Sequence, residues 1–321
     1  MEVNNPLRGR GNGRQTLEVV ESLYIDGRAG IDAGLVKRLV ATQFPQWSAL
    51  PVAPVEVDGW DNRTYRLGDE MTARLPTAAA YAPAVDKEHR WLPILAPTLP
   101  VAIPTPMAKG APGEGYPFSW SIRSWLDGET ASLDRIDDLS EFATSVADFI
   151  LALQRIDATG GPPAGAHSFY RGASPAYYDD ETCRTLAVLE GCIDTTRASA
   201  VWDAALEAAC SGPPVWFHGD VASGNLLVRN GRLAAVIDFG TSGVGDPACD
   251  LVIAWTMFSG DSRETFRSAV GQDPAMWARA RGWALWKALI SLAETIDRDE
   301  KRAAGNRRVI DEVLTDHYRA N

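Results

Sequence analysis

Three oxygen-bearing side chains lie close together in the sequence, in an order that suits phosphoryl transfer. Asp220 and Asn225 belong to residues 218–225 (HGDVASGN), and Asp238 follows in residues 237–240 (IDFG). A carboxylate such as Asp220 can orient and deprotonate an attacking hydroxyl, while the oxygens of Asn225 and Asp238 can hold the Mg²⁺ that carries a nucleoside triphosphate. The spacing therefore predicts a site with one base and two metal ligands.

The residues between the two expected ligands explain how they converge. Apolar residues 226–228 and 233–237 predict two strands, and the Asn-Gly pair at 230–231 is typical of a tight hairpin turn. Such a hairpin places Asn225, before the first strand, beside Asp238, after the second. Asp and Asn are also common in ordinary turns, but that preference does not account for the joint spacing of all three side chains.

Composition restricts the class of protein. The chain has 321 residues, of which 45% are hydrophobic, and no apolar run is long enough to span a bilayer. Its start is polar and lacks the apolar core of a signal peptide. The four cysteines, at 183, 192, 210 and 249, show no Cys-x-x-Cys spacing, so neither a zinc site nor a disulfide framework is indicated. These features predict a soluble protein of two lobes in the cytoplasm.

The net charge of −11 argues against a nucleic-acid partner, which would need a basic face. An acidic protein can attract a cationic substrate into its cleft, although acidity also serves solubility alone. The charge alone therefore does not decide the substrate, and we expect no nucleic acid and no membrane among the partners. The sequence gives no indication of an oligomeric state.

The first part of the chain alternates short strands with helices. Residues 1–29 are expected to be a mobile extension, because residues 9–14 (GRGNGR) within them are low in apolar residues. The elements expected after it are a helix over 35–44, strands at 55–57, 64–67 and 71–75, a helix over 83–95 and a strand at 119–125. They predict a small lobe of antiparallel strands over residues 30–126.

From residue 127 the chain is mainly helical apart from the hairpin. The expected elements are a helix over 140–156, a strand at 214–217, a buried helix opened by Asp246-Pro247 and ending at Phe258, and helices over 274–297 and 302–318. The sequence thus predicts an α+β protein whose second lobe, over 127–321, is larger and mainly helical.

These features together resemble one family. A mixed small lobe, a helical large lobe, the motifs at 218–225 and 237–240, and residues 245–251 (GDPACDL) are similar to the aminoglycoside phosphotransferases. That family belongs to the protein-kinase-like superfamily, which includes choline and fructosamine kinases. The resemblance extends from about residue 31 to the end and implies a bilobal protein-kinase-like fold, with a nucleotide-binding N-lobe and a catalytic C-lobe.

The resemblance assigns roles around the catalytic loop. It implies that Asp220 is the catalytic base and that Asn225 and Asp238 are magnesium ligands. His218 is expected to brace the loop rather than exchange protons. Asp250 is expected to be a buried carboxylate that ties the loop to the helix beneath it.

Other roles concern the nucleotide, ATP or GTP. The resemblance implies that Ser124, Trp125 and Leu126 form the hinge whose backbone groups pair with the purine edge. Residues 59–64, with Asn62, correspond to the turn that covers the nucleotide, although this turn has only one glycine.

One position departs from the family pattern. Many of these enzymes place on the third strand a lysine that binds the α- and β-phosphates and pairs with a helix glutamate. Here the strand offers Arg74, with Glu88 as its expected partner, while Lys87 lies beside Glu88 in the helix. An arginine can hold phosphate oxygens in a bidentate way, but Arg74 could also be a solvent-facing residue paired with a surface acid.

Two features separate this chain from protein kinases. Protein kinases have an arginine before the catalytic Asp, where this chain has Gly219, and residues 240–246 are too few to form a peptide-docking platform. We therefore expect a small-molecule kinase that is active without being phosphorylated.

The acceptor is expected between the catalytic loop and residues 255–321. Several acids there could bind a cationic acceptor, or could lie on solvated helix faces: Asp261, Glu264, Asp273, Glu294, Asp297, Asp299, Glu300, Asp311 and Glu312. Trp277, Trp283 and Trp286 could face a sugar or macrolide, or pack in the core.

The acceptor most in keeping with the resemblance is an aminoglycoside-type antibiotic. If the protein is an enzyme, the alternative acceptor is a macrolide or a metabolite such as an amino alcohol or amino sugar. If it is not an enzyme, the alternative is a nucleotide-binding protein without catalysis, but such a protein usually lacks one of Asp220, Asn225 and Asp238.

Overall fold

The computed structural model describes residues 28, 30–56, 58–271 and 273–320. Of the extension expected at 1–29, Arg28 alone is among the described residues. The chain divides into two units. The first contains the residues up to Asp86 together with Pro106–Trp125, and the second contains Lys87–Thr105 together with Leu126 and all that follows.

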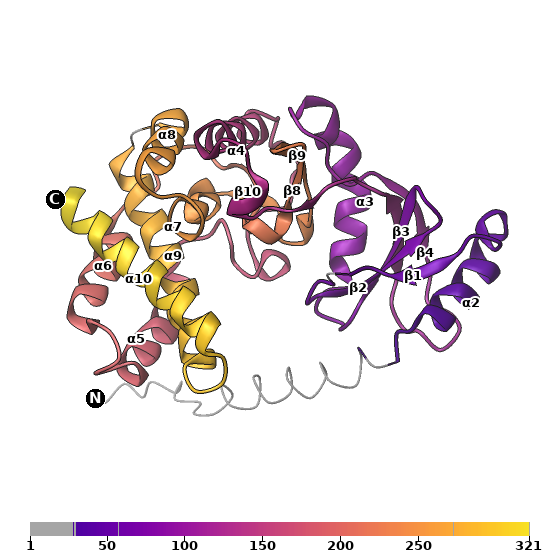
Figure 1. Cartoon of the computed structure of the whole chain (residues 1–321), viewed down its shortest axis with the longest axis horizontal. Coiled ribbons are helices and arrows are strands. Elements are labelled where there is room, and N and C mark those ends of the chain that lie inside the picture. Colours follow the sequence, from indigo (N-terminus) through magenta and orange to yellow (C-terminus); the bar gives the residue numbers. More distant parts are fainter. Residues whose placement is uncertain (1–27, 29, 57, 272, 321) are drawn as a thin grey trace, which may run out of the picture. The chain divides into compact units, whose positions relative to one another are not determined.

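A five-stranded antiparallel sheet forms the first unit (Figure 1). Its strands are β1 (Val52–Pro54), β2 (Asn62–Leu67), β3 (Met71–Pro76), β4 (Pro106–Gly110) and β5 (Trp120–Ser124), in the order β1-β2-β3-β5-β4. A turn at Gly68, which has a φ of +60°, connects β2 and β3 as predicted. The strand expected at 55–57 lies earlier in the chain, as β1, because its hydrogen-bonded register with β2 begins at Val52, opposite Leu67.

Helix α2 (Ala33–Gln43) covers this sheet and completes its core. The helix begins at Asp32, whose carboxylate accepts a hydrogen bond from the Leu35 amide at 2.7 Å, and it ends before Pro45. Its apolar side chains pack against inward-facing sheet residues such as Leu67 and Ile122. Burial of this one face of an amphipathic helix contributes to the unit's stability.

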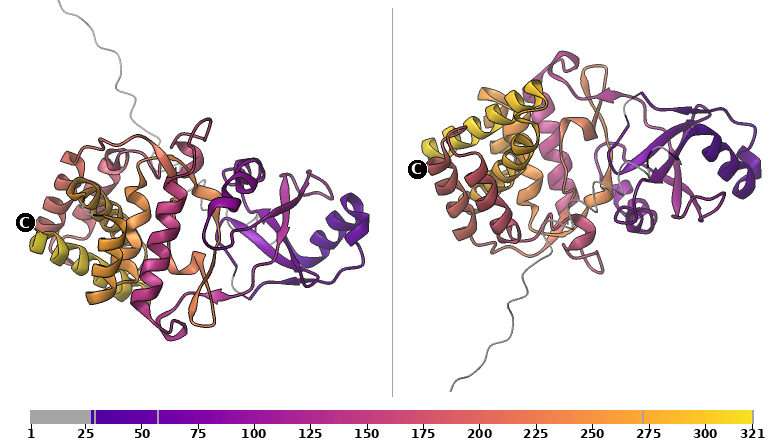
Figure 2. Two further views of the ribbon diagram at one scale, coloured as in Figure 1. Left: turned by 90° about the horizontal axis from the view of Figure 1, so that it is seen from above. Right: turned by 90° about the horizontal axis from the view of Figure 1, so that it is seen from below.

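Helices dominate the second unit, and Figure 2 shows them gathered around its core. They are α4 (Leu139–Gln154), α5 (Asp179–Val188), α6 (Thr195–Glu207), α7 (Ile253–Thr256), α8 (Gly260–Val270), α9 (Pro274–Thr295) and α10 (Glu300–Ala320). Helix α3 (Pro83–Leu95), where a helix was predicted, crosses from the first unit into the second. The long helix α9 packs against α10 and α6, so its apolar residues are buried on several sides.

One expected helix was wrong in type. The segment after Asp246-Pro247 winds first as a 3₁₀ helix, Pro247–Val252, and becomes α-helical only in α7. Asp246 caps it as predicted, because its carboxylate accepts a hydrogen bond from the Ala248 amide at 3.1 Å. The same buried carboxylate also accepts hydrogen bonds from Arg279 at 2.6 and 3.2 Å.

The α+β class predicted from the sequence is therefore confirmed, with an antiparallel sheet in one unit and mainly helices in the other. Within the described ranges, no helix combines the length and the apolar character that crossing a membrane requires.

Candidate active site

A buried strand and a buried carboxylate fix the start of the catalytic loop. Strand β7 (Val215–Phe217), paired with β10 (Gly243–Gly245), leads directly into it. Asp250 accepts hydrogen bonds from the backbone amides of His218 at 2.8 Å and Gly219 at 2.6 Å. Gly219 has a φ of +87°, which favours glycine. Asp250 thus holds the loop as the resemblance implied. Its burial raises its pKa, whereas His218 and the two amide donors lower it, and the net pKa lies above the ordinary value.

His218 uses both ring nitrogens inside the protein. Nδ1 accepts a hydrogen bond from the Asp220 amide at 3.2 Å, and Nε2 lies 3.0 Å from the Ile237 carbonyl, to which it donates. The ring is fully buried and packs edge-on against Phe239. This tautomer leaves neither nitrogen to exchange a proton with a substrate, so the geometry supports a bracing role.

Asp220 and Asn225 contact each other directly. The Asn225 amide nitrogen donates to the Asp220 backbone carbonyl at 2.9 Å and to its carboxylate Oδ2 at 3.0 Å. Because these bonds use the nitrogen, the amide oxygen is the atom that a metal ion would use.

The predicted hairpin connects Asn225 with Asp238. Strands β8 (Leu226–Arg229) and β9 (Arg232–Val236) are joined at Asn230 and Gly231, whose positive φ values of 52° and 73° define the tight turn. Just beyond the paired strands, the Ile237 amide donates to the Asn225 carbonyl at 2.8 Å. The hairpin thus brings the residue before Asp238 into contact with Asn225. Asp238 itself is left-handed, with a φ of 67°, a conformation that Asp tolerates.

The side-chain oxygens of Asn225 and Asp238 fit a magnesium ion. One amide oxygen and one carboxylate are hard ligands, and Mg²⁺ is commonly bound by one or two protein carboxylates plus phosphates and water. Among the described residues there is no group of three or more His, Cys, Asp or Glu that could hold a metal ion on its own. A Mg²⁺ at Asn225 and Asp238 would take its remaining ligands from phosphates and water, as is usual for this ion.

Sequence reasoning did not assign a role to Lys87, although it named the residue. From α3, its ammonium donates to the carbonyls of Gly240 at 2.6 Å and Ser242 at 2.9 Å, and lies 3.1 Å from His167 Nδ1. These carbonyls follow directly after Asp238. Burial lowers the Lys87 pKa to about 8, although the nearby carboxylates of Glu88 and Asp238 oppose that shift.

Sequence reasoning also missed Lys287. From α9, its ammonium lies 2.5 Å from Oδ1 of Asp220, the oxygen that Asn225 does not contact. Burial raises the Asp220 pKa, but the charge and hydrogen bond of Lys287, together with the charges of His218 and Arg171, outweigh burial, and the net pKa lies below its ordinary value. No local motif marks Lys287, because its partner is 67 positions earlier in the chain.

In the first unit, two of the residues expected at the nucleotide bind each other. The Asn62 amide, with its oxygen turned towards Arg74, accepts hydrogen bonds from that guanidinium at 3.1 and 3.3 Å. Arg74 lies in the middle of the sheet, opposite Thr64 of β2 and Ser121 of β5. Glu88, its expected partner, is buried in the second unit, and the pairing of Arg74 with Glu88 stays a prediction.

The expected hinge lies at the end of β5. Ser124 closes that strand, and the Trp125 amide donates to the Glu70 carbonyl at 2.7 Å. The Trp125 ring stacks under the Arg66 guanidinium, 3.7 Å from its centroid. Since the Trp125 N–H already has a backbone acceptor, pairing with a purine would use other backbone groups of the segment. Leu126, the third expected residue, begins the second unit's main segment.

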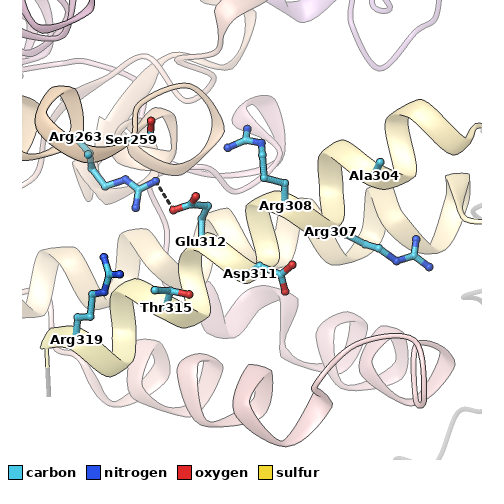
Figure 3. A pocket seen from close by; sticks show the side chains of 10 residues that line it. Ser259, Arg263, Ala304, Arg307, Arg308, Asp311, Glu312, Thr315 and Arg319 are labelled. Atoms are coloured by element: carbon cyan, nitrogen blue, oxygen red, sulfur yellow. Dashed lines mark hydrogen bonds and ion pairs between the residues drawn. The ribbon is translucent and has the colours of Figure 1, made fainter.

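Several acids of residues 255–321 have structural partners. Glu312 accepts a hydrogen bond from Arg263 at 2.8 Å in an open groove of about 560 Å³ between the start of α8 and α10 (Figure 3). Asp273 caps α9 by accepting from the Ala275 amide, and Asp299 accepts from the Arg302 amide, each at 3.0 Å. These three carboxylates stabilise helices and a groove wall.

The three tryptophans of the same region are buried. Trp277 and Trp283 are at most 2% exposed, as expected for core packing. Trp286 stacks on Tyr178 with 4.1 Å between ring centroids and lies beneath the Arg171 guanidinium at 4.7 Å. The charge of Arg171 also lowers the pKa of Asp220, so this aromatic cluster lies near the loop that carries Asp220.

A sheet unit, a helical unit and a loop that carries a carboxylate beside residues with hard oxygen donors are the features expected of a phosphotransferase with a protein-kinase-like fold. The sequence model of the phosphotransferase enzyme family (APH) matches residues 53–283, and the chain belongs to that family. A comparison of the sequence with curated proteins found no match.

Solved structures support the fold. The GDP complex of wild-type aminoglycoside 2'-phosphotransferase-IIIa is similar with a TM-score of 0.65 and 17% identity, covering 89% of this chain and 100% of that one. The streptomycin–ATP ternary complex of APH(2")-IIa gives a TM-score of 0.56 and 16% identity, covering 89% and 97%. Macrolide 2'-phosphotransferase MphH from Brachybacterium faecium gives 0.56 and 22%, covering 88% and 97%.

Proposed function

We propose that this protein transfers the γ-phosphoryl group of a nucleoside triphosphate, with Mg²⁺, to a hydroxyl of a small molecule, an aminoglycoside-type antibiotic. The observation that carries the proposal is the contact of Asp220 with Asn225, next to a hairpin that returns the chain to Asp238. One base and two hard ligands within a single corner are the minimum that this chemistry requires.

The chain's own residues would act as follows. Asp220 accepts the proton of the acceptor hydroxyl as that oxygen bonds to the γ-phosphorus. The bond from phosphorus to the β–γ bridging oxygen breaks, and the nucleoside diphosphate leaves with its electron pair. Asn225 and Asp238 would hold the Mg²⁺, which offsets charge on the phosphates. His218 and Asp250 keep the loop in place through their hydrogen bonds to its backbone.

The donor is ATP or GTP. Among similar proteins, one is described with GDP and another with ATP. In this chain we assign phosphate binding to Arg74, steadied by Asn62, and purine pairing to backbone groups of Ser124–Leu126. A nucleoside triphosphate donor is also in keeping with the cytoplasmic location expected from the sequence.

The acceptor class rests on the family and on its structural relatives. Among the similar proteins, APH(2")-IIa forms a complex with streptomycin and ATP, and MphH is a macrolide 2'-phosphotransferase. For this chain we rank aminoglycosides first and keep macrolides and amino alcohols as comparison acceptors.

The test is acceptor-dependent release of ADP or GDP by the purified protein, measured with and without Mg²⁺ on a panel of the three acceptor classes. Asp220→Asn, which removes the proposed base, is the negative control. Asp250→Glu keeps a buried carboxylate and changes a residue that does not touch the reacting atoms. Turnover with aminoglycosides that requires Mg²⁺ and disappears in Asp220→Asn supports the proposal. Turnover with amino alcohols alone overturns the acceptor class, and Mg²⁺-nucleotide binding without turnover on any acceptor overturns the reaction.

A further inference from the structure

Lys287 places a positive charge directly against Asp220, the residue proposed to be the catalytic base. The ammonium lies 2.5 Å from Asp220 Oδ1, and the Asn225 amide occupies Oδ2, so each oxygen of the base already accepts a hydrogen bond. A base must lie within hydrogen-bond reach of the proton it removes, and here both of its oxygens are engaged. The pair is therefore a disadvantage if the only role of Asp220 is deprotonation.

Stability does not explain the pair either. The Lys287 side chain is 41% exposed and that of Asp220 is 35% exposed. Ion pairs with this degree of exposure contribute little to folding, at most about 1 kcal/mol. Lys287 lies on α9, whose other residues are mostly buried. Its half-exposed ammonium extends from this core to the loop that carries Asp220.

Phosphoryl transfer supplies a use for such a cation. The transition state is loose, with negative charge spread over the three equatorial oxygens of the transferred group and little demand for a strong base. A lysine ammonium has three N–H donors, and in the described part of the chain the hydrogen bond to Asp220 is the one that Lys287 makes. Asp220 must lie against the acceptor oxygen that attacks phosphorus, so a group 2.5 Å from Asp220 is within reach of the phosphoryl oxygens.

We propose that Lys287 is a further catalytic residue, whose ammonium donates a hydrogen bond to the transferring phosphoryl group. In the free enzyme it neutralises Asp220. In the reaction the acceptor oxygen bonds to the γ-phosphorus, its proton passes to Asp220, and the nucleoside diphosphate leaves with the electrons of the broken bond. Lys287 keeps its protons throughout and stabilises the charge on the phosphoryl oxygens. This inference rests on the proposed function.

The first readout is kinetic. Lys287→Met removes the charge and keeps an unbranched side chain, Lys287→Arg keeps the charge, and Lys301→Met removes an exposed lysine on α10 as the control. We expect Lys287→Met to lower kcat by roughly 10²- to 10³-fold, the scale on which one charge-stabilising donor acts, with little change in the nucleotide KM. Lys287→Arg should recover a large part of this loss, and Lys301→Met should match the wild type.

The second readout does not depend on turnover. Aluminium fluoride with Mg²⁺ and a nucleoside diphosphate imitates the planar phosphoryl group, so its affinity reports transition-state contacts. Lys287→Met should bind Mg²⁺–ADP or Mg²⁺–GDP as the wild type does, but should lose at least about tenfold in affinity once aluminium fluoride is added. An unchanged aluminium fluoride affinity, a raised kcat or a change in acceptor KM alone would each overturn the inference.

These outcomes separate the inference from the proposed function. If the wild type turns over and Asp220→Asn does not, the proposed function stands, whatever Lys287→Met does. If the wild type neither turns over an acceptor nor hydrolyses the nucleotide with water, both proposals fail together.

Discussion

The metal side and the base side of the candidate site each depend on a lysine from a helix outside the catalytic loop, but the two lysines are held differently. Lys87 binds the backbone carbonyls of Gly240 and Ser242, which are fixed by the path of the main chain. Lys287 binds a side chain, Asp220, and remains 41% exposed. A lysine bound to backbone acts as structure, whereas one bound to an exposed carboxylate is available to a substrate.

Replacing each lysine tests whether Lys87 is structural and Lys287 is not, because the two variants should then differ in stability. Lys87→Met leaves two carbonyls in a partly buried segment without a donor, and each such group costs about 1–3 kcal/mol. We expect urea denaturation to show a loss of about 3 kcal/mol in the free energy of unfolding. Lys287→Met should lose less than about 1 kcal/mol. Equal losses for the two variants would mean that both lysines are structural.

A second pair of variants compares Asp250, which binds the backbone of the catalytic loop, with Asp246, which pairs with Arg279 away from that loop. Asp250→Asn replaces a buried carboxylate that accepts two backbone amides, and Asp246→Asn weakens the buried pairing with Arg279. Each should lower the free energy of unfolding by about 2 kcal/mol in thermal or urea denaturation. In steady-state kinetics, kcat should fall for Asp250→Asn alone, because the carboxylate of Asp250 positions the catalytic loop. A matching fall for Asp246→Asn would show that general loosening, not loop position, controls activity.

Raising the pH should change the contribution of Lys87. The pKa of Lys87 is about 8 in the folded protein against 10.5 ordinarily, so between these values the unfolded chain holds a proton that the folded protein has lost. Unfolding then takes up a proton, and stability rises with pH across this range. The wild type should therefore gain in free energy of unfolding relative to Lys87→Met between pH 8 and 10.5. A constant difference would mean that the Lys87 pKa is not lowered.

The smallest expected effect concerns Asp220 in acid. Lys287 holds the Asp220 pKa below its ordinary value, so the stabilisation that this pair provides is present above that ordinary pKa and is lost as pH falls through the folded-state value. The stability of the wild type and of Lys287→Met should therefore converge as the pH falls towards 3 or below. Guanidinium denaturation at stepped pH measures this convergence, and a gap that persists in strong acid would contradict it.

The part of the site that is local in sequence was predictable. A hairpin is determined by its turn residues and the alternation beside them, so the approach of Asn225 to the Asp238 segment followed from the Asn-Gly pair at 230–231. The same reasoning located β2, β3 and the ends of α3. Beyond this, the bracing by Asp250 came from the family resemblance, because nothing local to residues 246–251 predicts which amides its carboxylate binds.

The long-range part was not predictable from the sequence alone. Lys287 and Lys87 find their partners 67 and 153 positions away, and helical periodicity indicates which face is buried but not what a half-buried ammonium will meet. The 3₁₀ winding of Pro247–Val252 was also missed, since its apolar residues suit either kind of helix. The turn at Gly59–Thr64 and the Arg74–Glu88 pair stay predictions.

The position of Lys287 on α9 also bears on how enzymes of this kind diverge. The catalytic loop, its hairpin and Asp250 form one set of mutually dependent hydrogen bonds, in which a single substitution disturbs several contacts. Lys287 contributes to the same centre from a separate helix and through one bond. A single substitution at position 287 can therefore change the charge beside Asp220 while the hydrogen bonds of the loop stay in place.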